Sequence, residues 1–188
     1  RDPLALPDHR LAELAAQLNG IPHLKRLRIH SRLPIVLPER VDAALLAWLK
    51  NVPLQKVMVV HANHPNEIGE DTAQALRSLR ECGVTVLNQS VLLRGINDSP
   101  GILAELSEAL FAAGAMPYYL HLLDKVQGAA HFDVPEIDAL TIMDGLQSRL
   151  PGYLVPRLVR ELPGAPAKRP VQRIENLDTA PDQPDVLL

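Results

Sequence analysis

The stretch VTVLNQSVLLRGINDSPGILAELSEALFAAGAMPYYLHLLD, residues 84–124, decides the fold of this chain. In order, it contains a strand-like apolar run, an amphipathic run and a second strand-like run, at 84–93, 99–114 and 116–124. Ser99 followed by Pro100 suits the start of a helix, and Gly114 suits the left-handed position that follows its end. The stretch therefore predicts two parallel strands joined by a helical crossover.

The same alternation extends on both sides of this stretch. Further strands are predicted at 24–31 and 56–63, and further helices at 40–51, 70–83 and 136–150. Each strand with its helix takes about thirty residues, which is typical of a βαβ unit. Four such units in series predict an α/β fold, with a parallel sheet and helices outside it.

Composition narrows the function classes. The chain has 188 residues, of which 47% are hydrophobic, and this is most simply one globular unit. A net charge of -3 gives no field that attracts nucleic acid or an anionic membrane. No apolar run approaches the roughly 18 residues of a membrane span, and the first residues lack the apolar core of a secretion signal. We therefore expect a cytoplasmic protein with no nucleic-acid or membrane partner.

Polar residues gather where each predicted strand ends. They are His30, Ser31, Arg32, His61, Asn63, His64, Asn66, Asn88, Gln89, Ser90, His121 and Asp124. A single histidine at a strand end is more often structural than catalytic. Four polar ends in a row favour one shared pocket, because parallel-barrel enzymes place their chemistry at the carboxyl ends of the strands.

Two weaker patterns leave alternatives open. His61, His64 and Glu67 could form a metal site, but Pro65 favours a loop, and we expect no metal site within this chain. Lys168 lies in a Pro/Gly/Ala loop, where it is either part of a solvated basic tail or an amine that can form a Schiff base. Composition alone favours the solvated tail.

Several blocks carry a resemblance to a known family. They are IHSRLPIVLPERV (29–41), HANHPNEI (61–68), LNQSVLLRGIND (87–98), MPYYLHLLDKVQGAAHF (116–132) and PGYLVPRLVRELPGAPAK (151–168). Together they resemble the lysine 2,3-aminomutase family of radical S-adenosylmethionine (SAM) enzymes over nearly all of residues 2–170. The segments DKVQGAAHF and GAPAK are similar to the branch that supplies β-lysine for modifying translation elongation factor P.

The resemblance implies a partial (β/α) TIM-like barrel of radical SAM type. About four consecutive βα units would lie in residues 1–150, followed by a segment with the pyridoxal 5′-phosphate (PLP) lysine (151–175) and a flexible tail (176–188). In such enzymes a [4Fe-4S] cluster and SAM generate a radical, and the amino group of a lysine held on PLP migrates from the α- to the β-carbon. The implied substrate is thus L-α-lysine.

The resemblance also assigns roles to residues of this chain. Lys168 matches the PLP-binding catalytic lysine, and Asp124 matches a carboxylate that holds the substrate's ε-ammonium group. A second substrate carboxylate falls at Glu161, where the family more often has aspartate. The residues expected beside SAM are His61, Gln89, Ser31, Arg32 and Asp2. Asp2 would end a Gly-Gly-Asp segment, but the residue before it here is Arg1.

The CxxxCxxC loop that binds the cluster in this family is absent, since Cys82 is the only cysteine. The first two strands of the barrel are absent as well. We therefore interpret the chain as a fragment that is inactive alone. Because its first strand is unpaired, we expect it either to self-associate, as a homo-oligomer, or to be marginally stable, unless another chain or segment covers that edge. The alternative is a non-catalytic barrel remnant that serves as a binding or interaction module. The sequence upstream of Arg1 would distinguish the two.

Overall fold

The computed structural model describes residues 2–124 and 128–173, which form one six-stranded sheet in the order β1-β2-β3-β4-β5-β6. The strands are β1 (Arg26–His30), β2 (Gln55–Val60), β3 (Val84–Val91), β4 (Ala115–His121), β5 (Arg157–Arg160) and β6 (Arg169–Pro170). The first five are parallel, and the two-residue β6 runs antiparallel to β5. The four predicted strands are confirmed, and β5 extends the same sheet.

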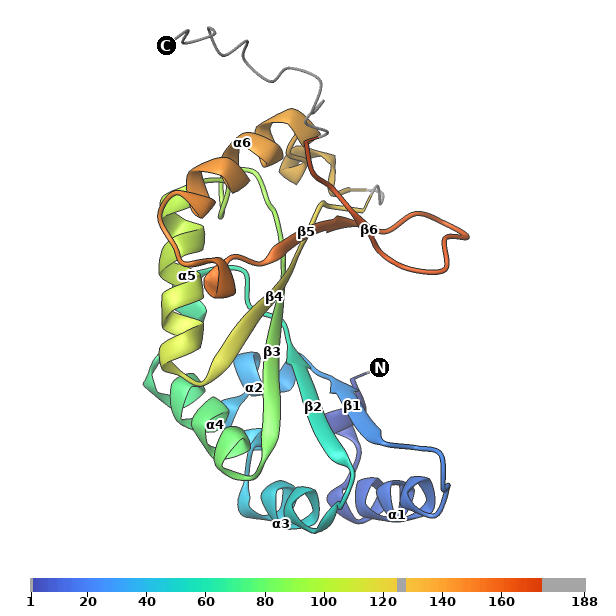
Figure 1. The fold of residues 1–188 in the computed structure, drawn as a ribbon. Coiled ribbons are helices and arrows are strands. Elements are labelled where there is room, and N and C mark those ends of the chain that lie inside the picture. Colours follow the sequence, from blue (N-terminus) through green and yellow to red (C-terminus); the bar gives the residue numbers. More distant parts are fainter. Residues whose placement is uncertain (1, 125–127, 174–188) are drawn as a thin grey trace, which may run out of the picture.

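One helix precedes β1, and the others connect the parallel strands. They are α1 (Asp8–Asn19), α2 (Leu33–Val36), α3 (Ala43–Asn51), α4 (Glu70–Glu81), α5 (Pro100–Ala112) and α6 (Glu136–Gln147). Short 3-10 turns are η1 (Pro3–Ala5), η2 (Pro38–Arg40), η3 (Pro65–Glu67), η4 (Ala130–Phe132) and η5 (Gly152–Leu154). The ribbon has a crescent outline, with α4, α5 and α6 along the convex face of the sheet and the opposite, concave face open (Figure 1).

The predicted helix boundaries rest on local chemistry that the structure confirms. Ser99 Oγ accepts a hydrogen bond from the backbone N–H of Ile102 at 3.3 Å, with Pro100 in the first turn of α5. Gly83 and Gly114 follow α4 and α5 with φ of 77° and 89°, a region that glycine occupies without steric cost.

The helix α1 was not predicted, and tertiary contacts explain its place. Asp8, in its first turn, accepts hydrogen bonds from Arg40 and from the indole N–H of Trp48, both at 2.9 Å. Arg40 also donates to the carbonyl of Leu4 at 2.8 Å. These contacts fix α1 against η2 and α3, which lie far along the chain.

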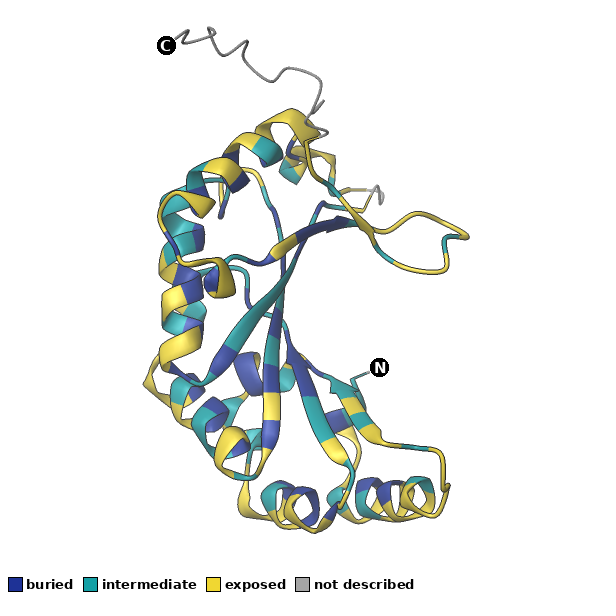
Figure 2. Ribbon diagram, in the orientation of Figure 1, coloured by how far each residue is buried: buried dark blue, intermediate teal, exposed yellow. Residues whose placement is uncertain are grey.

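The core has two parts. One joins β1, β2 and β3 to α1, α3, α4 and part of α5, and the other joins β4 and β5 to α6 and the start of α5. In β3, buried side chains alternate with partly exposed ones, so that Val86, Asn88 and Ser90 face the helices while Leu87 and Gln89 face the concave side. Figure 2 shows buried residues alternating with more exposed ones along β3.

A β-bulge interrupts the pairing of β3 with β4. Asn88 pairs with Pro117 and Gln89 pairs with Tyr119, so Tyr118 is an extra residue on β4. The rings of Tyr118 and Tyr119 have centroids 3.8 Å apart, and their hydroxyl groups are hydrogen-bonded at 3.0 Å. After the bulge, Leu120 is fully buried in the core on the helix side.

Across residues 2–124 and 128–173, no helix is both long and apolar enough to cross a membrane. The predicted cytoplasmic location stays a prediction. The flexible tail predicted at 176–188 lies outside the described residues.

Candidate active site at the carboxyl ends of the strands

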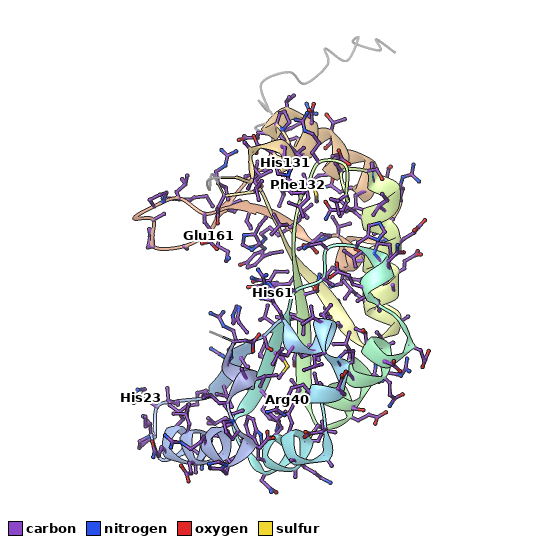
Figure 3. All side chains as sticks on the ribbon, turned by 180° about the vertical axis from the view of Figure 1, so that it is seen from behind. His23, Arg40, His61, His131, Phe132 and Glu161 are labelled. Atoms are coloured by element: carbon purple, nitrogen blue, oxygen red, sulfur yellow. The ribbon has the colours of Figure 1, made fainter. Side chains whose placement is uncertain are left out.

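The candidate site lies on the concave face, where the parallel strands end. Strand register places Gln89 beside Tyr119 and His121 beside Val159, so these residues share one face of the sheet. His30 ends β1 and His61 follows β2 directly, and their rings are 6.3 Å apart. His61 and Glu161 both lie on the side of the sheet away from α4 and α5 (Figure 3).

Lys168 is brought to this face by the turn between β5 and β6. Arg160 pairs with Arg169, which closes the intervening loop and returns the chain to the end of β4. Lys168 Nζ lies 3.1 Å from His121 Nε2 and donates a hydrogen bond to Glu161 Oε1. The same ammonium group lies 5.5 Å from the centre of the Tyr119 ring. Lys168 is thus held at the site and is not part of a solvated tail.

A second cluster surrounds Asp2 at the other end of the same edge. Its carboxylate accepts hydrogen bonds from Ser31 Oγ at 2.8 Å, from the backbone N–H of Arg32 at 2.7 Å and from that of Leu4 at 3.0 Å. Ser31 is buried, with 2% of its surface exposed. Three of the predicted SAM neighbours are therefore in direct contact with one another.

The histidines connect the two clusters electrostatically. Burial and the nearby Arg32, His30 and His121 lower the pKa of His61, while Asp2 opposes them. Burial, Arg28 and Lys168 lower the pKa of His30. Both histidines therefore favour the neutral form at pH 7, and each is within the field of groups from other strands.

His121 is the histidine in contact with Lys168. Burial lowers its pKa, the Lys168 ammonium lowers it further, and Glu161 and Asp124 oppose the shift. A neutral His121 accepts from the ammonium at Nε2, so its proton is on Nδ1, 3.9 Å from Glu161 Oε1. The hydrogen bond from Lys168 and its positive charge lower the pKa of Glu161.

The predicted site residues are only partly brought together. Lys168 and Glu161 are in contact with each other, and Asp2, Ser31 and Arg32 form the second cluster. Asp124 is exposed, three residues after β4, and it is near enough to influence His121. The roles that the resemblance assigns to these residues stay predictions.

Other polar strand ends serve the fold. Asn88 accepts from the backbone N–H of Ala62 at 2.8 Å and donates to its carbonyl at 3.0 Å, and Ser90 donates to the same carbonyl at 2.7 Å. Asn63 accepts from the backbone N–H of Val91 at 2.8 Å. The prediction that Asn88 and Ser90 line the pocket is wrong, because both are buried on the helix side.

The segment HANHPNE has a structural explanation as well. The His64 side chain accepts from the N–H of Asn66 at 3.2 Å, and Glu67 accepts from the N–H of His64 at 2.8 Å. These bonds form a capping box for η3. Within the part of the chain that the structure describes, no three His, Cys, Asp or Glu residues are grouped as metal ligands. Cys82 donates a weak hydrogen bond to the carbonyl of Leu46 at 3.2 Å, beside the core.

Sequence reasoning gave no individual role to Tyr119 and His121. Both face Lys168, and their rings meet edge to face with centroids 5.8 Å apart. Their spacing of two on one strand places them on the same face and could have signalled this. Because Tyr118 is an extra residue in the strand, the sequence does not show which face of the sheet Tyr119 and His121 share.

The parallel strands and the helices on one face of the sheet define part of an α/β barrel. A solved radical SAM methyltransferase from Sphaerobacter thermophilus matches with a TM-score of 0.51 at 18% identity, covering 71% of this chain and 40% of that one. At this identity the match shows the fold alone. It confirms the predicted fold class.

Sequence comparison identifies the family. L-lysine 2,3-aminomutase from Escherichia coli is 56% identical over 170 residues, which cover 90% of this chain and 50% of that protein. The enzymes of the same name from Haemophilus influenzae and Clostridium subterminale are 54% identical over 167 residues, covering 89% and 49%, and 40% identical over 170 residues, covering 90% and 41%. No family model matches the chain. The chain belongs to the lysine 2,3-aminomutase family and spans about half the length of these relatives, or somewhat less.

Proposed function

We propose that the protein carrying this chain is an L-lysine 2,3-aminomutase, an isomerase that converts L-α-lysine to β-lysine with PLP, SAM and a [4Fe-4S] cluster. The observation that carries the proposal is the 56% identity over 170 residues to a curated enzyme of that name. The placement of Lys168 on the concave face supports it independently, because the lysine is held where parallel-barrel enzymes place their chemistry.

The surroundings of Lys168 fit a role in binding PLP. The Lys168 side chain is 28% exposed, so it is reachable from the open face while its amine contacts Glu161 and His121. PLP, when bound, supplies an electron-accepting ring that favours radical chemistry at the carbons next to the bound nitrogen. Lys168 would hold this cofactor, with the ring of Tyr119 beneath the amine.

The carboxylates fit the recognition of a second ammonium group. Glu161 is paired with Lys168 in this structure, and covalent attachment of Lys168 to a cofactor would end that pairing. Glu161 would then be free to receive the ε-ammonium of the substrate, with Asp124 nearby. These contacts would orient the lysine chain and bring its β-carbon into position.

The Asp2 cluster fits one end of SAM. A carboxylate offers about four acceptor sites, and three of those on Asp2 are used by Ser31, Arg32 and Leu4. One site is left for the amino group of SAM, and His61 and Gln89 lie along the same concave face. The [4Fe-4S] cluster does not fit the residues of this chain, because Cys82 is the only cysteine in the chain and lies in the helical layer. Its ligands would belong to the rest of the protein, so we expect the 188 residues alone to be inactive.

The full-length protein tests the proposal. Anaerobic reconstitution with iron, sulfide and PLP should give SAM-dependent conversion of L-α-lysine to β-lysine. Borohydride reduction followed by peptide mapping should place the phosphopyridoxyl label on Lys168, with exposed Lys25 as the internal control. Absence of β-lysine from a protein that has bound cluster and PLP would refute the activity, and a label on another lysine would refute the role of Lys168.

The finer assignment concerns the use of the product. We propose that β-lysine made here serves the modification of elongation factor P, which the resemblance of DKVQGAAHF to that branch supports. The E. coli and H. influenzae relatives are more similar to this chain than the Clostridium relative is. Growth of a deletion strain, with elongation factor P analysed by mass spectrometry, should show the loss of a β-lysyl adduct. Self-association of the chain stays a prediction.

A further inference from the structure

The position of Lys168 depends on very few contacts. It lies in the loop 161–168, most of whose residues are exposed, just before the two-residue strand β6. The two polar partners of its ammonium are Glu161 and His121. Glu161 is 53% exposed and sits on the same loop, so its pairing with Lys168 contributes little to fixing the loop against the sheet.

His121 has the properties of an anchor. It ends β4, a strand paired on both sides, and its side chain is only 12% exposed. Its Nε2 lies 3.1 Å from Lys168 Nζ across 47 residues of sequence. A hydrogen bond between an ammonium and a largely buried acceptor is stronger than one between neutral groups.

We propose that His121 is the positioning residue for Lys168: its neutral imidazole holds the amine over the concave face, and protonation of the imidazole releases it. A protonated Nε2 would point a second N–H at an ammonium 3.1 Å away, and both would carry positive charge. The importance of this contact for catalysis rests on the proposed function, whereas the contact itself does not.

The groups around His121 decide where the release occurs. Lys168 and burial favour the neutral imidazole, and Glu161 and Asp124 favour the charged one. His61 faces it from the end of β2, and Tyr119 lies on its own strand. Because the balance lowers the pKa of His121, release is expected below about pH 6.5, the ordinary value for histidine.

Two substitutions of His121 separate its role in holding Lys168 from the effect of its protonation. His121→Gln places an amide oxygen near the position of Nε2, so it accepts from Lys168 and does not titrate. His121→Leu removes the acceptor at similar bulk. The first readout is trypsin cleavage after Lys168 at pH 8 in the full-length protein without PLP, because trypsin needs a lysine side chain that is free to enter its pocket. Cleavage after Lys25, in the loop before β1, is the internal control.

We expect His121→Leu to raise cleavage after Lys168 about tenfold relative to Lys25, the equivalent of one charged hydrogen bond, and His121→Gln to stay near the unsubstituted protein. The second readout is the ratio of borohydride-fixed PLP on Lys168 to that on Lys25 between pH 5.5 and 8. This ratio should fall with acid in the unsubstituted protein, stay flat in His121→Gln and be low throughout in His121→Leu.

Equal cleavage in all three proteins, or a His121→Gln protein that behaves like His121→Leu, would overturn the proposal. A labelling ratio that falls with acid equally in His121→Gln would overturn the part played by protonation. If PLP reacts with another lysine in every protein, the proposed function fails, while the trypsin result still decides whether His121 holds Lys168.

Discussion

Polar side chains at the ends of the strands form two sets, one on each face of the sheet. On the helix side, Asn88 and Ser90 are buried and bonded to the backbone of Ala62. On the concave side, His61, His121 and Lys168 are partly exposed, and their partners are mostly other side chains. Side chains bonded to backbone of a packed sheet have one arrangement, whereas titratable side chains facing one another can rearrange. The first set therefore maintains the fold, and the second is available for chemistry.

The largest expected effect comes from the concave side. Lys168→Ala in the full-length protein should lower β-lysine formation by more than about 10³-fold, because no other group replaces a covalent amine. The free energy of unfolding should change little, since the residue lies on an exposed loop. Product formation and urea unfolding measure the two effects. A large loss of stability would remove the distinction between the two faces.

The opposite result is expected on the helix side. Asn88→Ala should lower the free energy of unfolding by about 2–4 kcal/mol, because it leaves the N–H and C=O of Ala62 with fewer partners in a buried place. Its neighbour Gln89, on the concave face, is the matched control, and Gln89→Ala should cost less than about 1 kcal/mol. Urea unfolding of both proteins compares them. Equal losses would contradict the assignment of the two residues to different faces.

Low pH should lower the stability of the fold through the histidines of the concave face. The pKa of His30, of His61 and of His121 is lowered by burial, so the unfolded chain binds protons more readily than the folded one. Stability from these groups is fully present above about pH 6.5 and is lost as the pH falls below it, by on the order of 1 kcal/mol per group. Unfolding midpoints at pH 5.5 and 7.5 measure this loss.

His121→Gln should reduce the acid sensitivity, and the same change at exposed His23 is the control. A larger reduction from His23→Gln than from His121→Gln would show that the concave histidines do not cause the effect.

The smallest effect is expected where a titratable residue serves only as a cap. His64→Ala should cost about 1 kcal/mol, the usual value of an N-cap, because it removes the hydrogen bond to the N–H of Asn66. His64→Asn keeps an acceptor and should restore most of this loss in thermal unfolding. If His64→Ala instead lowered lysine turnover strongly and left stability unchanged, His64 would belong with the concave set.

The alternation of strands and helices was predictable because caps and periodicity are local. The face of the sheet on which each polar side chain at a strand end lies was not predictable. The run VTVLNQSVLL is apolar around Asn88, Gln89 and Ser90, so it carries no alternation that would show which of them faces the helices. The contact of His121 with Lys168 joins residues 47 apart through a sheet edge that only the folded chain defines. The resemblance supplied Lys168 as a candidate but gave no partner for it.

The bulge at Tyr118 sets the phase of β4. Up to Pro117 the strand follows one alternation, and after Tyr118 it follows the other, which places Leu120 in the core and His121 on the open face. Without the bulge, Tyr118 would take a place in the regular alternation and the two would exchange faces, with an imidazole among leucines and a leucine beneath Lys168. A single-codon deletion of Tyr118 would remove the bulge and leave every later side chain of β4 on its present face, because Tyr119 would then follow Pro117 in regular alternation. The bulge therefore lets β4 carry one extra tyrosine while Leu120 stays in the core and His121 stays on the open face.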